Sequence, residues 1–110
     1  MTQTTDQHTD RQTLDALIEE AVGARQMLPP YERCVELNRL LRAAIGDLYL
    51  AAQERLGQLP EHRRDWHRVR NALADTDAVL ADNLGSGLLS AAIHLGDLAR
   101  QARTLATVNP

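Results

Sequence analysis

The densest group of side chains that could do chemistry lies at residues 61–70, which read EHRRDWHRVR. Arginine presents a planar fork of N–H donors that can bind phosphate or carboxylate in a bidentate manner. Helical spacing would place four polar residues on one outward face: Arg64, Arg68, Asn71 and Asp75. The pattern predicts either a site for phosphate or an acidic partner, or a solvated helix face with local ion pairs.

The sequence does not indicate metal or nucleophilic chemistry. The histidines are scattered, and His62 and His67, five residues apart, would lie about 140° apart around a helix. The Glu-x-x-His motif of di-iron bundles is absent, as are the P-loop, the dinucleotide glycine fingerprint and G-x-S-x-G. Cys34 falls on an apolar stripe, which favours a buried, inert thiol. We therefore expect no catalytic residue, no metal and no cofactor, and we do not expect an enzyme.

Length and composition predict one small all-α domain. The 110 residues are rich in Leu, Ala, Arg, Glu and Gln, which favour helices, and they include no Phe. The net charge of -3 has the wrong sign for a dedicated nucleic-acid binder. The single cysteine and the lack of a secretory or membrane-spanning segment lead us to expect a cytoplasmic protein that does not associate with membranes.

Apolar periodicity predicts four helices, over about 10–27, 31–56, 60–83 and 87–106, after a disordered tail of residues 1–9. Three breaks would separate the helices: Pro29-Pro30, Gly57 with Pro60, and residues 84–87. Short connections favour an antiparallel four-helix bundle formed by residues 10–110 as a single domain. In a second arrangement, the shorter first helix would pack across the other three.

Two leucines of the second predicted helix do not follow its main stripe. The stripe consists of Cys34, Leu37, Leu41, Ala44, Ile45, Leu48 and Ala52. Leu40 and Leu50 lie off it, so they would either form a second contact surface or be isolated exposed leucines.

An up-and-down arrangement would collect most arginines at one end of the bundle. These are Arg11, Arg55, Arg63, Arg64, Arg68, Arg70, Arg100 and Arg103. In the third predicted helix, arginines crowd the start and aspartates crowd the end, which is the reverse of what the helix dipole prefers. We therefore expect a neighbouring group or a ligand to offset the unfavourable charges.

From residue 28 onward, the order and spacing of several short motifs resemble a family of short actinobacterial proteins known as a domain of unknown function. The motifs are Leu28-Pro29-Pro30-Tyr31-Glu32, Leu37-Asn38-Arg39-Leu40-Leu41-Arg42, Leu59-Pro60, and Gly87-Leu88-Leu89-Ser90 through His94 to Leu98-Ala99-Arg100. The end of the chain, Thr107-Val108-Asn109-Pro110, departs from the polar, aromatic-containing tail of that family. The resemblance implies an all-α domain and a high-GC actinobacterial host, and it implies no activity.

The leading functional expectation is a non-enzymatic interaction or regulatory protein that binds a protein partner or itself. The expected docking residues are Arg63, Arg64, Arg68, Arg100 and Arg103, with Leu40 and Leu50. One alternative is a nucleic-acid-binding regulator that uses the arginine cluster of residues 63–70, although the net charge disfavours it. Another is a small-molecule sensor with a pocket between helices near Trp66.

Overall fold

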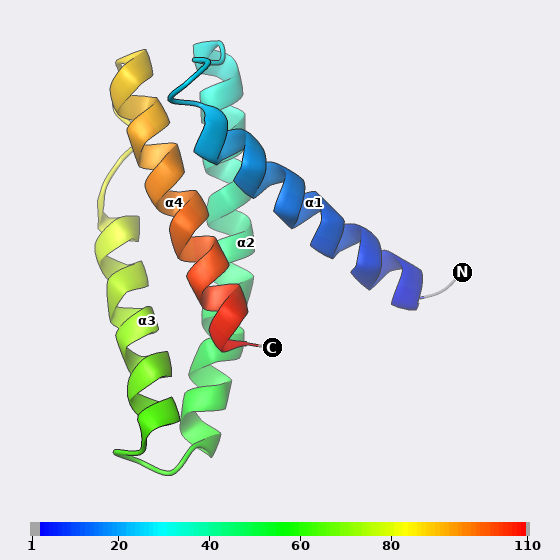
Figure 1. Cartoon of the computed structure of the whole chain (residues 1–110), viewed down its shortest axis with the longest axis vertical. Coiled ribbons are helices and arrows are strands. Elements are labelled where there is room, and N and C mark those ends of the chain that lie inside the picture. The colour runs from blue at the N-terminus through cyan, green and yellow to red at the C-terminus, as the bar shows by residue number, and fades with distance from the viewer. Residues whose placement is uncertain (1–2, 110) are drawn as a thin grey trace.

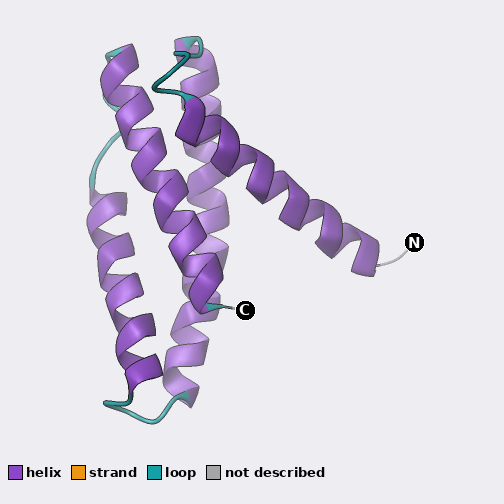
Figure 2. Ribbon diagram, in the orientation of Figure 1, coloured by secondary structure: helices purple, strands orange, loops and turns teal. Residues whose placement is uncertain are grey.

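The computed structural model describes the backbone of residues 3–109 and the side chains of residues 13–109. It contains four helices, α1 (Gln3–Gly23), α2 (Tyr31–Gln58), α3 (Arg64–Ala81) and α4 (Leu88–Val108), and no strand in this part of the chain. Successive helices run in opposite directions and are joined by short loops (Figures 1 and 2). The prediction of an all-α fold is confirmed.

The helices α2, α3 and α4 stand side by side, whereas α1 lies obliquely against α2 and α4 and its N-terminal end projects away (Figure 1). α1 packs against α4 and α2 but makes no contact with α3 among the described residues. The fold is therefore a compact helical bundle in which the first helix lies across the others. This corresponds to the second arrangement considered from the sequence.

The central element is α4, which packs against all three other helices and most extensively against α2. Small residues on its buried faces allow this close approach: Ala91, Ala92, Gly96, Ala99 and Ala102. Leu95, Leu98 and Leu105, all fully buried, fill the space between them. Complete burial of one such leucine contributes about 1.5–3 kcal/mol to folding.

The apolar stripes of the other helices face α4 as their periodicity predicts. α2 buries Cys34, Leu37, Leu41, Ile45 and Ala52, and α3 buries Val69, Ala72, Leu73 and Thr76. α1 contributes Leu17, Ile18 and Ala21. These side chains form one continuous core.

The boundary between α2 and α3 differs from the prediction. α2 continues through Gly57 to Gln58, and α3 begins at Arg64 instead of residue 60. Pro60 explains the end of α2, because proline forces the preceding residue out of the helical region, and Leu59 has an extended ψ of 144°. The chain then turns through His62, whose φ of 67° is uncommon for a residue with a side chain.

The limits of α1 also differ from the expected range of 10–27, since the helix begins at Gln3 and ends at Gly23. Residues 3–9, which the sequence predicted to belong to a disordered tail, form the first part of α1, and residues 1 and 2 lie outside the described part. In the described portion of the chain, no helix combines the length and the apolar character needed to cross a bilayer.

Candidate functional site

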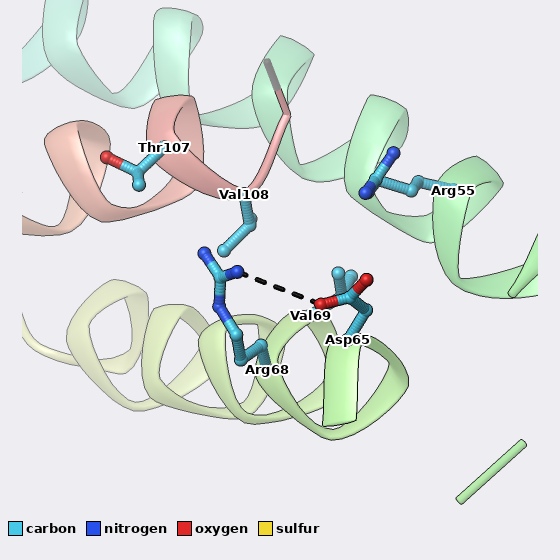
Figure 3. Close-up of a pocket in the computed structure, with 6 residues that line it drawn as sticks. All are labelled: Arg55, Asp65, Arg68, Val69, Thr107 and Val108. Atoms are coloured by element: carbon cyan, nitrogen blue, oxygen red, sulfur yellow. Dashed lines mark ion pairs between the residues drawn. The ribbon is translucent and has the colours of Figure 1, made fainter. Parts of the chain in front are cut away.

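The main concave feature is a groove between α3 and α4 that reaches the end of α2. Its inner part is a cavity of about 60 Å³ lined by Arg55, Asp65, Arg68, Val69, Thr107 and Val108 (Figure 3). Its outer part is a shallower hollow of about 350 Å³ lined by Arg68, Asn71, Ala72, Asp75, Thr104, Thr107 and Val108. Because the two parts share Arg68, Thr107 and Val108, we treat them as one site and call it the arginine groove.

The groove exists because α4 ends before its neighbours do. Asn109 follows α4 and donates from Nδ2 to the carbonyl oxygen of Leu48 at 3.0 Å. The last turns of α2 and the first turns of α3 therefore extend beyond the end of α4 (Figure 1). Arg55 from α2 and Arg68 from α3 border the space next to Val108 that this difference leaves (Figure 3).

Positive charge in the inner cavity is only partly compensated. Arg68 Nη1 lies 3.9 Å from Asp65 Oδ1, and both side chains are more than half exposed, so the pair is loose. The Nε of Arg55 is buried and has no hydrogen-bond partner among the described residues. Two guanidinium groups thus face one carboxylate, and one buried N–H lacks an acceptor.

The structure separates the arginines that the sequence placed at one end. Arg63 and Arg64 lie exposed at the start of α3, and Arg68 lines both parts of the groove. Arg100 and Arg103 flank Gln101, which hydrogen-bonds to the backbone of Ala72, so they lie beside the middle of α3. The separation arises because Arg100 and Arg103 precede the last turn of α4, whereas Thr107 and Val108 at its end lie next to Asp65 and Arg68. The side chain of Arg11 lies outside the described residues.

The two off-stripe leucines have different environments. Leu40 is half-buried and packs against the core. Leu50 is 64% exposed on the outer side of α2. Of the two, only Leu50 is available as a surface residue.

A cluster of aromatic and cationic side chains around Trp66, at the start of α3, was not evident from the sequence. The ring centroids of His62 and Trp66 lie 5.1 Å apart, and those of Trp66 and His67 lie 5.0 Å apart. The guanidinium carbon of Arg70 lies 5.4 Å from the Trp66 ring centroid. Helical spacing predicted that the two histidines would diverge, but His62 lies outside the helix and its turn brings the rings to 6.0 Å. Among the side chains from residue 13 onward, no three His, Cys, Asp or Glu are placed to hold a metal ion.

At the C-terminal end of α3, Arg42 of α2 supplies a positive charge, which is the sign that the helix dipole favours at that end. Its Nη1 donates to the Leu80 carbonyl at 3.2 Å, and its Nη2 donates to the Asp82 carbonyl at 2.5 Å. A cation that binds the last carbonyls of a helix stabilises that end. Arg42 is therefore a neighbouring cation next to the acidic end of α3.

Arg42 also fixes the state of a buried histidine. Its Nη2 lies 2.9 Å from Nε2 of His94, which is 6% exposed. Because a guanidinium can only donate, the Nε2 of His94 must accept and is therefore unprotonated. Burial, followed by the charge of Arg42, lowers the pKa of His94 below its usual 6.5.

Cys34 is fully buried, as its position on the apolar stripe predicted. Loss of solvent raises the pKa of its thiol, because burial disfavours the thiolate.

Comparisons with known proteins place the chain in a family. Neither the curated proteins nor the solved structures contain a match to it. The model of a family of unknown function, DUF6415, matches residues 12–108, which agrees with the resemblance to a domain of unknown function. Because the match covers almost all of the described residues, the chain belongs to the DUF6415 family.

Proposed function

We propose that this protein is a non-enzymatic binding protein that docks an acidic segment of a protein partner in the arginine groove. The observation that carries the proposal is the position of Arg68, which lines both parts of the groove. Arg63 and Arg64 lie exposed at the start of the same helix. Arginine is enriched at protein interfaces and among the residues that dominate their binding energy.

The lining of the groove is suited to bind a partner segment in one orientation. Val69, Ala72 and Val108 provide apolar surface, whereas Arg68 and Asp75 provide opposite charges. A bound segment would place a carboxylate near Arg68 and a donor near Asp75. Complementary charges of this kind give specificity and speed association.

The hydroxyl groups in the groove favour binding over catalysis. Thr104 donates to the Arg100 carbonyl at 3.1 Å, and Thr107 donates to the Arg103 carbonyl at 2.9 Å. A nucleophile needs an adjacent base within hydrogen-bond reach, and these hydroxyls are instead engaged with the backbone. We also propose a cytoplasmic location and an actinobacterial host, which rest on the composition and on the resemblance described above.

Crosslinking in the host with wild-type protein and an Arg68→Glu variant tests the docking proposal. We expect the wild type to crosslink to one partner and Arg68→Glu to lose it. Arg39→Glu is the matched control, because Arg39 is an exposed arginine on α2 that does not line the groove. A partner that binds Arg68→Glu as well as wild type would refute docking in the groove.

The partner can also be a second copy of the chain, with the arginine groove facing the acidic end of α3. Light scattering coupled to size exclusion at about 50 and 500 mM salt tests this self-association, because exposed charges are screened at high salt. A dimer that dissociates at high salt supports the charged contact. A dimer that persists would instead point to an apolar interface.

The cluster around Trp66 favours a second candidate, single-stranded nucleic-acid binding through Arg63, Arg64, Arg68 and Arg70. Such proteins combine basic grooves with aromatic rings on which bases stack. Trp66 is the only tryptophan, so its fluorescence reports directly on stacking. We expect oligonucleotides to quench it at low salt if this candidate is correct, and absence of quenching excludes it. Trp66 lines neither part of the groove, so the groove gives no support to a small-molecule sensor with a pocket near Trp66.

A further inference from the structure

We propose that the inner cavity of the arginine groove binds a single phosphate group. The proposal concerns the ligand chemistry of the cavity between the ends of α2, α3 and α4, and it holds whether or not a protein partner docks outside. Arg55 and Arg68 enter this cavity from two different helices (Figure 3). A tetrahedral oxyanion presents acceptor oxygens in several directions, so one phosphate can accept hydrogen bonds from both guanidinium groups.

The unpartnered nitrogen of Arg55 is the second observation that points to an anion. Its Nε is buried and makes no hydrogen bond within the described part of the chain. Buried polar groups are nearly always paired, because an unmade hydrogen bond to a charged group is costly. Because Arg55 lines the cavity, an anion bound there would lie beside a guanidinium whose hydrogen-bonding capacity is not fully used within the described residues.

The size of the cavity agrees with this ligand. Its volume of about 60 Å³ exceeds what a single ordered water requires. Val69 and Val108 contribute the apolar part of its lining. The cavity therefore offers space for one small anion next to two guanidinium groups.

Asp65 is the group that a phosphate must displace. It lines the cavity and lies 3.9 Å from Arg68 Nη1, too far for a strong hydrogen bond. Because both side chains are more than half exposed, the pair can separate at little cost. Removing the Asp65 charge should therefore strengthen phosphate binding, whereas removing either arginine should weaken it.

Titration calorimetry with inorganic phosphate at constant ionic strength tests the site, with sodium chloride as the reference salt. We expect Arg55→Met and Arg68→Met each to weaken phosphate binding at least about tenfold, the loss expected for a charge-assisted hydrogen bond. Asp65→Asn should bind phosphate more tightly than wild type. Arg64→Met is the matched control, because Arg64 belongs to the same helix but lines neither part of the groove.

The arginine variants should weaken phosphate binding and Asp65→Asn should strengthen it, so the two expected changes in affinity have opposite signs. Circular dichroism melts identify any variant that folds poorly, and Asp65→Asn then still reports on the cavity. A second titration with a phosphoserine peptide separates a free ion from a protein-borne phosphate. Phosphate binding no stronger than chloride, or a wild-type affinity in Arg55→Met, would overturn the proposal. The crosslinking experiment can fail independently, so the loss of the docking proposal is distinguishable from the loss of this site.

Discussion

Replacing Arg42 by methionine should destabilise the bundle strongly, although the residue lies far from the arginine groove. The substitution keeps the aliphatic stem but removes the donors to the Leu80 and Asp82 carbonyls and to His94. Hydrogen bonds to charged groups contribute about 1.5–3 kcal/mol each when buried. Since Arg42 is only half-buried, we count the three contacts together as about 3 kcal/mol. That is a large fraction of the ~5–15 kcal/mol that stabilises a typical domain.

Urea denaturation followed by circular dichroism measures this loss as a lower midpoint with an unchanged slope. Arg39→Met is the matched control, because Arg39 lies on the same helix and pairs with Glu36 at the exposed surface. We expect the control to unfold at the wild-type midpoint. If Arg42→Met unfolds at the same urea concentration as the control, Arg42 does not stabilise the end of α3 and our reasoning is wrong.

Three further predictions concern buried groups. The lowered pKa of His94 means that the unfolded chain binds more protons there, so stability should be constant above about pH 6.5 and fall as the pH drops from 6.5 toward the folded pKa. Urea midpoints across pH 7.5–5 measure this, and a His94→Gln variant should lack the decline. The thiol of Cys34 should react with Ellman's reagent only after denaturant is added, since the side chain is fully buried, and prompt reaction in buffer would contradict its burial. Gln101→Leu should cost about 1–3 kcal/mol, because its Nε2 donates to Ala72 and Thr76 in the core, and thermal melts with an exposed Thr104→Val control measure the loss.

Periodicity predicted the helices and their buried faces because burial repeats with the helical turn. It identified Leu37, Leu41 and Ile45 as core residues, and all three are fully buried. It did not predict that α4 buries two polar residues, His94 and Gln101. Their partners are on other helices, so the sequence of α4 alone carries no sign of them.

The candidate site was also predicted only in part, because its residues come from three different helices. The spacing of Arg64, Arg68, Asn71 and Asp75 predicted a shared polar face. The last three of these residues line one side of the groove, whereas Arg64 lines neither part of it. Arg55 and Thr107 complete the cavity only because α4 ends where it does. The axial offset between helices depends on tertiary packing, which apolar stripes do not encode.

The central place of α4 affects how the protein can fold during synthesis. α4 is the last of the four helices to leave the ribosome, yet it packs against every other helix. Until it emerges, the leucines of α2 lack the surface that covers them in the finished bundle. The nascent chain therefore exposes an apolar surface that α4 covers in the finished bundle, and a ribosome stalled before residue 88 would hold a chain unable to complete its core.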